Sequence, residues 1–228
     1  MRRLFNIANE PWITAVTETG TLVELSLRDT FLRAHALTQV RLPTAVQTGG
    51  TLRLLEAITY RITGTDKPAK NDAIWHKERN ALFDQSVFEE AKVNAYFDEW
   101  EHRFWLIDED RPFGQDPRLV DDLTKTQGLS KIVIDRPSAN TVRWFGASLT
   151  DVGPKEATSW LLATLCFGPG EATGTRHKWG SCKAPLPRNK VNVHLVASNL
   201  HKSLLSNLVP PGSEPEPFPW ETHLPTAD

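Results

Sequence analysis

Residues 44–64 read TAVQTGGTLRLLEAITYRITG, and this stretch decides the fold. Thr44 and Gln47 have the spacing of a capping box, in which two side chains satisfy the first free amides of a helix. Gly64 supplies a stop, and the consecutive glycines at 49 and 50 weaken the first turns. We therefore predict a core-facing helix. Its apolar side chains recur at helical spacing, at Leu52, Leu55, Ile58 and Ile62.

The residues before this helix predict a β-hairpin and a short helix. Residues 4–7 and 12–16 are rich in β-prone side chains, Thr19-Gly20 makes a turn, and residues 22–25 resume the pattern. Ser26, with an acidic residue three positions later, predicts the start of the short helix.

Three more helices are predicted on the C-terminal side. Each has a start signal, which is a capping-box serine, a first-turn proline or an asparagine cap. Alternating apolar side chains predict a strand over residues 191–197, and residues 104–107 are expected to form a strand edge or a loop. The predicted helices span residues 86–100, 154–167 and 199–208.

The composition is that of a globular protein. The chain has 228 residues, of which 39% are hydrophobic and 24% charged. At about 150 residues per domain, this length favours one large domain with an appendage. We predict a mixed α+β domain over residues 1–209, with an N-terminal β-hairpin and several helices. Residues 210–228 hold six prolines, so we expect a proline-rich linker or tail that contributes nothing to the core.

Membrane and export signals are absent from the sequence. No apolar run approaches the roughly 20 residues of a membrane-spanning helix, and no signal-peptide core follows Met1. Cys166 and Cys182 lie in no C-x-x-C pair and are too few for a disulfide framework. We expect a cytosolic protein with two plain thiols, no metal and no cofactor.

The net charge of −2 argues against a nucleic-acid partner, but it is unevenly distributed. Residues 172–213 contain no acidic side chain and carry a charge of +6, which leaves 20 basic and 28 acidic residues elsewhere. Glycines, His177 and Trp179 interleave with these cations, which permits close approach to phosphates. We call residues 172–213 the basic sector. The six cations of residues 172–213 are Arg176, Lys178, Lys183, Arg188, Lys190 and Lys202.

A second, weaker basic patch runs from Lys125 to Arg143, beside Trp144 and Phe145, with Asp135 as its acidic residue. Either patch could equally be a solvated face, because charged stretches of this size are common on protein surfaces. Six phosphate contacts would give a slope of about −5 in log affinity against log salt, which makes nucleic-acid binding testable.

Nucleotide and hydrolase motifs do not fit. Gly168, Gly170 and Gly174 read G-x-G-x-x-x-G, which is one residue longer than the dinucleotide fingerprint and follows a predicted helix instead of a strand. The chain has no phosphate-binding loop, no G-x-S-x-G elbow and no H-E-x-x-H helix. Enzyme chemistry is therefore not visible in the motifs.

Two sets of side chains have the chemistry of metal ligands. Asp108, Glu109 and Asp110 are consecutive and point in different directions, so a surface turn is favoured over a two-metal site. His194 and His201 lie seven positions apart across a strand-to-helix junction, so we expect satisfied or exposed histidines instead of ligands.

Five stretches, taken in order, resemble one family. They are FNIANEPWITAV (5–16), LPTAVQTGGTLRLLEAI (42–58), RFWLIDEDRPFGQ (103–115), RPSANTVRWFG (136–146) and WLLATLCFGPG (160–170). The family is the large subunit (CasA) of the type I-E CRISPR surveillance complex Cascade. The stretch 103–115 is the most specific, because it is close to the family's Phe-x-Leu-Phe-Asp-x-x-Arg-Pro-Phe phrase. The resemblance covers residues 1 to about 210.

This resemblance implies a non-catalytic subunit of an RNA-guided antiviral interference complex. Such a subunit recognises the protospacer-adjacent motif in duplex DNA, helps to open the duplex and contacts the guide RNA end and the backbone subunit. The implied partners are guide RNA, other Cascade subunits, double-stranded target DNA and a helicase-nuclease that docks after target binding. Further DNA-reading elements of the family and its C-terminal helical bundle lie beyond Asp228, so an N-terminal domain is implied.

The resemblance also implies two functional loops. A guide and backbone-subunit loop falls within residues 138–147, and its aromatic residue falls on Phe145, which could instead be a core side chain. A glycine loop that approaches DNA through the minor groove maps between residues 168 and 180. Its glycines are scattered here, whereas the family often has consecutive ones, so which backbone reads DNA stays open. The candidate residues are Asn140, Arg143, Trp144 and Phe145 for the first loop, and Gly168, Gly170, Gly174, Arg176, Lys178, Gly180 and Lys183 for the second.

Two alternatives from other classes stay open. One is a metal-dependent cytosolic hydrolase or nuclease that uses the carboxylates of Asp108–Asp116. The other is a structural platform whose basic loop binds an acidic protein partner. Metal-dependent turnover would indicate the first, and competition between duplex DNA and an acidic partner would test the second.

Overall fold

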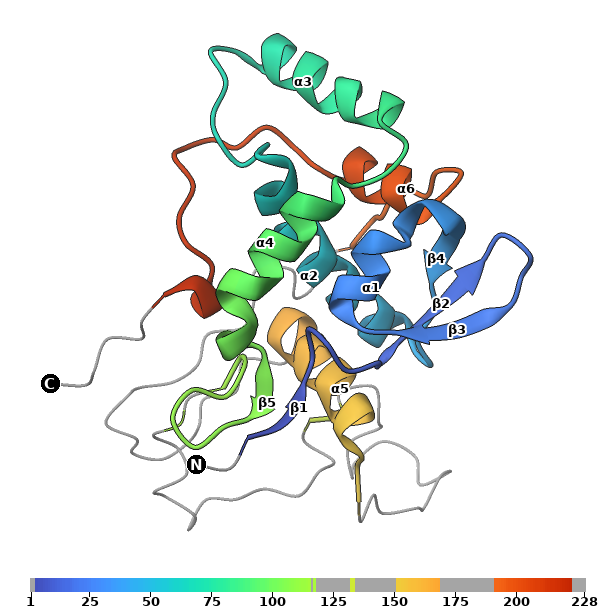
Figure 1. The fold of residues 1–228 in the computed structure, drawn as a ribbon, viewed down its shortest axis with the longest axis vertical. Coiled ribbons are helices and arrows are strands. Elements are labelled where there is room, and N and C mark those ends of the chain that lie inside the picture. The colour runs from blue at the N-terminus through green and yellow to red at the C-terminus, as the bar shows by residue number, and fades with distance from the viewer. Residues whose placement is uncertain (1–2, 116, 118–131, 134–150, 169–190, 223–228) are drawn as a thin grey trace, which may run out of the picture.

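Helix α2 (Ala45–Thr63) runs through the middle of the molecule, and the other elements pack around it (Figure 1). The computed structural model describes residues 3–115, 117, 132–133, 151–168 and 191–222. The mixed α+β class is confirmed. The other helices are α1 (Leu27–Leu32), α3 (Asp72–Asp84), α4 (Glu90–Trp100), α5 (Pro154–Phe167) and α6 (Leu200–Ser206), and the strands are β1 (Leu4–Asn6), β2 (Ile13–Thr17), β3 (Leu22–Leu25), β4 (Leu37–Val40) and β5 (Trp105–Ile107).

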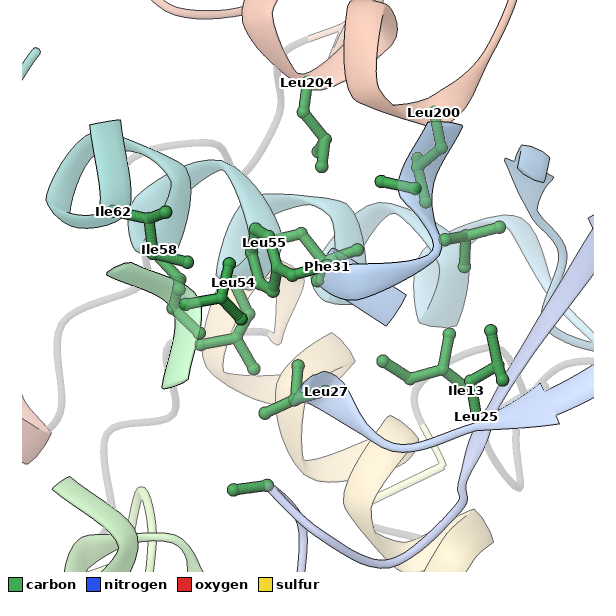
Figure 2. Close-up of a cluster of buried hydrophobic side chains, with 14 of the residues drawn as sticks. Ile13, Leu25, Leu27, Phe31, Leu54, Leu55, Ile58, Ile62, Leu200 and Leu204 are labelled. Carbon is green, nitrogen blue, oxygen red and sulfur yellow. The ribbon is translucent and has the colours of Figure 1, made fainter. Parts of the chain in front are cut away.

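The predicted start and end of α2 are confirmed. The Thr44 hydroxyl accepts a hydrogen bond from the Gln47 N–H, and the Gln47 side chain accepts one from the Thr44 N–H at 3.2 Å. Gly64 ends the helix in the left-handed region at φ +70°. Between these caps the helix buries an apolar face in the main core, together with side chains from α1, β2, β3 and α6 (Figure 2). The buried apolar residues of α2 are Leu54, Leu55, Ile58 and Ile62.

The N-terminal strands form two small antiparallel sheets. The predicted hairpin is present, with Ile13 opposite Leu25 in β2 and β3, and β4 adds a third strand in the order β3-β2-β4. Strand β1 lies outside this sheet and pairs with β5, with Leu4 opposite Ile107. The expected strand edge at 104–107 is therefore a strand whose partner lies about 100 positions earlier.

Two helix starts differ from the sequence prediction. Ser86 does not cap a helix: its φ is +63°, and α4 starts at Glu90 without a side-chain cap. Sequence analysis did not predict helix α3, in which Trp75 is the one buried residue. Asn71 caps α3 by accepting a hydrogen bond from the Ile74 N–H at 3.0 Å.

The predicted strand over residues 191–197 is wrong. These residues form no ladder, and Val191 and Val193 are 90% and 74% exposed. Side chains hold the segment instead, because the Asn207 amide bonds to both the N–H and the C=O of Leu195, at 2.8 and 2.9 Å. Alternation predicted extended backbone here, but a strand also needs a neighbouring strand.

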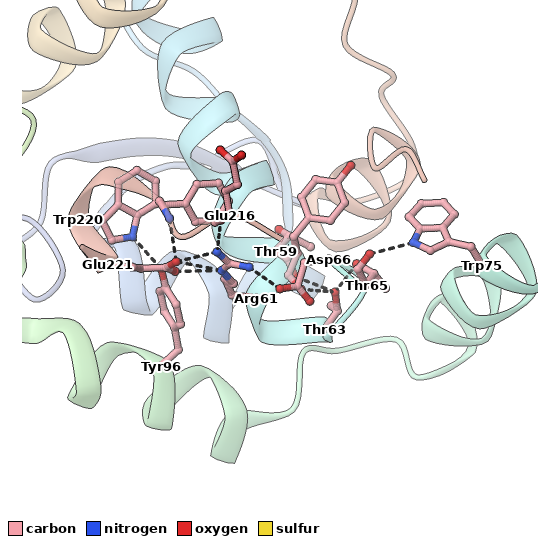
Figure 3. Close-up of polar contacts among 12 residues, drawn as sticks. Thr59, Arg61, Thr63, Thr65, Asp66, Trp75, Tyr96, Glu216, Trp220 and Glu221 are labelled. Atoms are coloured by element: carbon pink, nitrogen blue, oxygen red, sulfur yellow. Dashed lines mark hydrogen bonds and ion pairs between the residues drawn. The ribbon is translucent and has the colours of Figure 1, made fainter. Parts of the chain in front are cut away.

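The expectation that nothing after Pro210 joins the core is also wrong. We call residues 209–222 the C-terminal strap. Trp220 of the strap packs against Phe104 and Phe113, with ring centroids 6.3 and 5.8 Å apart. Glu221 accepts hydrogen bonds from Arg61 and from the Tyr96 hydroxyl (Figure 3). Proline-rich composition predicted a linker, but it is not informative about the side chains between the prolines.

His201 is neither satisfied nor exposed, contrary to expectation. Its side chain lies in the core, edge-on to Phe88 with centroids 4.5 Å apart, and its Nδ1 has no hydrogen-bond partner among the described residues. Burial, together with the charges of His35 and Lys202, lowers the pKa of His201 to about 4. The folded protein therefore holds this imidazole neutral.

We expect His201 to make stability depend on pH. Its folded-state pKa lies below the ordinary value of 6.5, so the stabilisation is complete above about pH 6.5 and is lost as pH falls towards 4. The difference amounts to about 3 kcal/mol in the free energy of unfolding. Urea unfolding of the protein and of His201→Leu between pH 7 and pH 4 measures it. In His201→Leu the free energy of unfolding should no longer fall between pH 7 and pH 4 through this residue, whereas in the exposed-site control His76→Leu it should fall as in the unsubstituted protein. An equal dependence on pH in all three proteins would contradict the prediction.

Candidate nucleic-acid interface

Helix α5 separates the two predicted loops in the chain. The guide loop at 138–147 precedes its first residue, Pro154, and the glycine loop begins just after its last residue, Phe167. The helix has 14 residues, which corresponds to a length of about 21 Å at 1.5 Å per residue. The end of the guide loop and the start of the glycine loop therefore lie at opposite ends of one helix.

Helix α5 is fixed against α2 by an unusually close approach of the two backbones. A Cβ atom added at Gly50 would lie 2.9 Å from the backbone N of Ala163 and from the carbonyl carbon and oxygen of Leu162. One turn earlier in α2, the Gln47 amide donates a hydrogen bond of 2.8 Å to the Ser159 hydroxyl. The two adjacent glycines, which weaken an isolated helix, here make room for α5.

Gly168 lies at the start of the predicted glycine loop and ends α5. Its N–H donates to the Thr164 carbonyl at 2.8 Å, and an added Cβ would collide with that same carbonyl oxygen. Helix termination thus accounts for a glycine at this position. The other candidate residues of this loop lie outside the described residues; they are Gly170, Gly174, Arg176, Lys178, Gly180 and Lys183.

The segment that follows the glycine loop is also anchored to α2. His194 Nδ1 lies 2.9 Å from Glu56 Oε1, and both side chains are largely buried. The next residue, Leu195, is held by Asn207 as described above. One helix, α2, therefore carries both stems of the loop, through Gly50 on one side and Glu56 on the other.

The guide loop has a stem on α5. The Thr164 hydroxyl donates a hydrogen bond of 2.8 Å to the carbonyl of Ile132, and the buried Val133 packs against Trp160 and Ala163. On the far side of the loop, Lys155 pairs with Glu24 of β3 at 2.5 Å. The candidate residues Asn140, Arg143, Trp144 and Phe145 lie outside the described residues.

The acidic cluster at 108–110 closes a turn. Asp108 is buried and accepts hydrogen bonds from the backbone N–H of Asp110 and Arg111, at 2.8 and 3.2 Å, and from Arg3 at 2.8 Å. Burial raises the pKa of Asp108, but these three hydrogen bonds outweigh it and leave the pKa below its ordinary value. Three hydrogen bonds occupy most of the acceptor sites of this carboxylate, so it serves the turn. Among the described residues, no three His, Cys, Asp or Glu side chains gather as a metal site.

Cys166 is a free thiol on α5, beside Arg53 of α2. Burial raises its pKa, so it is a plain thiol as predicted. Its position beside Arg53 was not predicted. Cys182 lies outside the described residues. No helix within the described part of the chain has the length and apolar character required to cross a bilayer.

Sequence reasoning missed the residues that support the loops. Gly50, Glu56 and Asn207 act through partners far away in the chain, and none belongs to a local motif. The adjacent pair of glycines inside a strongly periodic helix was an available signal. Glycine lowers helix propensity, so two glycines together suggest that another backbone packs closely against the helix there.

The fold is shared with known proteins. A chain of a solved CRISPR RNA-guided surveillance complex matches with a TM-score of 0.84 and 30% identity, over 100% of this chain and 48% of that one. The solved Thermus thermophilus CasA (Cse1) matches with a TM-score of 0.74 and 25% identity, over 96% of this chain and 44% of that one. These similarities define the class, an α+β domain of the kind found in CRISPR surveillance complexes.

The family follows from the sequence comparisons. The family model of CRISPR-associated protein Cse1 matches residues 6–228, and the chain belongs to this family. A CRISPR-associated protein CasA/Cse1 of Thermus thermophilus is 29% identical over 224 residues, which make up 95% of this chain and 42% of that protein. The chain thus spans less than half the length of the relatives described here, and the resemblance inferred from the motifs is confirmed.

Proposed function

We propose that this chain is a non-catalytic subunit of a type I-E RNA-guided interference complex in the cytosol. In that complex it contacts the guide RNA end and the backbone subunit through residues 138–147. It recognises the protospacer-adjacent motif in duplex DNA through residues 168–183, helps to open the duplex and presents a docking surface to a helicase-nuclease. The observation that carries the proposal is the charge of +6 over residues 172–213 of an otherwise acidic chain in a member of the Cse1 family.

The two stems support the proposed role of the glycine loop. A loop that reads DNA by shape must approach the minor groove from a fixed base, since readout there is degenerate and depends on groove width. Gly168 and His194, on either side of residues 169–190, are both tied to helices. The guide RNA recognises the target sequence by base pairing, so the protein needs to recognise only a short motif. Another guide-directed effector divides recognition between RNA and protein in the same way.

The length of α5 supports two separate contacts. Its ends lie about 21 Å apart, which is about six base-pair steps of B-form DNA at 3.4 Å per step. The end of the guide loop and the start of the glycine loop can therefore face different partners, while the first stem of the guide loop, at Ile132, lies beside Thr164 near the end of α5. The hydrolase alternative has less support, because Asp108 is committed to the turn at 108–111.

Charge reversal in the basic sector tests the proposal. In the complex reconstituted with guide RNA, the triple variant Arg176→Glu, Lys178→Glu and Lys183→Glu should weaken binding to every duplex. It should also reduce the slope of log affinity against log salt by about 3, at roughly 0.9 per phosphate contact. Fluorescence anisotropy between 50 and 200 mM salt, about the range in which such contacts dominate, measures the slope.

A matched control removes the same charge elsewhere. Lys67 and Lys70 are exposed between α2 and α3, and Lys77 is exposed on α3. Their reversal to glutamate should leave the slope unchanged. An equal loss in both triple variants would indicate a general charge effect and would remove the basic sector from the interface.

A further inference from the structure

A cavity of about 460 Å³ lies between α2, α5, the turn at 111–115 and the strap. Its walls are mainly apolar, with Leu54 from α2, Leu162 and Leu165 from α5, and Trp220 from the strap. Gly114, at φ +65°, forms part of the wall, and an added Cβ there would lie 2.9 Å from Leu165 Cδ1. The size falls within the usual range of ligand-binding sites, about 300–1,000 Å³.

The charged residues that line this cavity are all cations. Arg53, Arg103 and Arg111 line it, and no carboxylate of the described residues does. Arg53 lies beside Cys166 and forms no ion pair with a carboxylate in the described part of the chain. On a chain with more acidic than basic residues, three arginines and no carboxylate in the lining make this wall electropositive.

Arg103 adds a buried charge that is incompletely compensated. Its side chain is 6% exposed, and its Nε and Nη2 donate to the carbonyls of Trp220 and Thr222, at 3.0 and 2.9 Å. Its Nη1 is buried and has no hydrogen-bond partner within the described part of the chain. Burial and the neighbouring cation of Arg111 lower the pKa of Arg103, although Asp108 opposes this. A nearby anion would therefore be stabilised here.

The lining favours an apolar side chain over a nucleobase. A base edge needs hydrogen-bond partners, and Gln115, the one amide side chain in the lining, already donates to the carbonyls of Leu106 and Phe113. The cavity is also open, because Leu165 in its wall is 48% exposed. A small ligand is usually enclosed over most of its surface, whereas an anchor side chain of a larger partner fills an open pocket.

We propose that this cavity is a docking site for an acidic protein segment, which inserts one large apolar side chain between α2 and α5 while its carboxylates face Arg53, Arg103 and Arg111. The arginines supply complementarity of charge, and the apolar walls supply the desolvated centre on which such interfaces depend. The proposal does not rest on DNA recognition, because none of the side chains of this cavity belongs to the predicted loops.

Two labelled peptides test the proposal by fluorescence anisotropy. One has a central phenylalanine between runs of three glutamates, and the other has alanine in place of the phenylalanine. The phenylalanine peptide should bind the full chain about tenfold more tightly at low salt. Leu165→Glu, which adds a carboxylate to the wall at a half-exposed position, should weaken it by about tenfold or more. Arg53→Glu should weaken it and reduce its dependence on salt.

Leu22→Glu is the matched control, because Leu22 is 58% exposed on β3 and lines no part of this cavity. It should bind like the unsubstituted protein. Equal affinity for the two peptides, no binding up to about 1 mM, or the same loss in Leu22→Glu would overturn the proposal. A labelled oligothymidine is the second probe. If Leu165→Glu lost binding to the oligothymidine but not to the phenylalanine peptide, the cavity would bind a base and the proposal would be overturned.

Discussion

Gly50→Leu is expected to destabilise the protein by about 3 kcal/mol, at the upper end of the range for overpacked cores. An added Cβ already meets the backbone of Leu162 and Ala163 at 2.9 Å, so the two helices must move apart. Helix propensity alone would change the free energy of unfolding in the opposite direction, because replacing a glycine inside a helix stabilises the helix by about 1 kcal/mol. The sign of the change therefore decides whether close packing or propensity dominates at this position.

The measurement is urea unfolding of Gly50→Ala and Gly50→Leu beside a control, Gly212→Ala. Gly212 has no heavy atom within 4 Å of an added Cβ, so its replacement should change the free energy of unfolding by less than about 0.5 kcal/mol. Graded destabilisation from alanine to leucine at position 50 is expected. Stabilisation by Gly50→Ala would show that α2 and α5 do not approach as closely as described.

The second large effect is expected at Arg61, which fastens the strap to α2. Its guanidinium donates to both carboxylate oxygens of Glu221, to the Glu216 carbonyl at 2.7 Å and to Asp66 (Figure 3). The Glu221 side chain is 6% exposed. Arg61→Ala leaves this carboxylate buried without its cation, and breaking a buried pair in this way typically costs about 3–5 kcal/mol.

Burial raises the pKa of Tyr96, which donates to the same carboxylate and so remains a neutral hydrogen-bond donor at neutral pH. One hydrogen bond from this hydroxyl does not replace the guanidinium. We expect Arg61→Ala to lower the free energy of unfolding by about 3 kcal/mol and to make residues 210–222 sensitive to protease.

A double-mutant cycle isolates this contact. Glu221→Gln removes the charge that Arg61→Ala would leave unpaired, so the double variant should be more stable than the sum of the single changes predicts. Arg33→Ala is the control, because Arg33 is exposed on the surface. Strict additivity of the two changes, or equal protease resistance of the strap in Arg61→Ala, would contradict the proposed role of the pair.

Local chemistry predicted much of the fold. The capping box of Thr44 and Gln47, the left-handed Gly64 and the first-turn Pro154 mark the ends of α2 and the start of α5 as the sequence indicated. These signals act over three or four residues, so a single sequence contains them in full. The hairpin of β2 and β3 was accessible for the same reason.

Contacts between distant segments were not predictable in this way. β1 pairs with β5 across about 100 residues, and Arg103 reaches the carbonyl of Trp220 across 117. Residues 191–197 show the converse: their alternation is that of a strand, but no partner strand lies beside them among the described residues. Pairing depends on what lies alongside, which local pattern does not encode.

The candidate site likewise has parts that local sequence predicts and parts that depend on tertiary contacts. The two loops were located by family resemblance, and the basic sector by the distribution of charge along the chain. The anchors of the loop stems, Gly50, Glu56 and Asn207, depend on tertiary contacts. Sequence reasoning therefore proposed the nucleic-acid contacts but did not find the residues that anchor the stems of the two loops.

Selection from randomised DNA tests the proposed function most directly. The complex reconstituted with this protein and a guide RNA is mixed with duplexes that match the guide and are randomised beside the match. Bound duplexes are then sequenced. We predict enrichment of one short motif, which disappears when the protein is omitted and weakens in the Arg176, Lys178 and Lys183 triple variant. Bound duplexes with no enriched motif, or the same motif without this protein, would contradict its role in motif recognition.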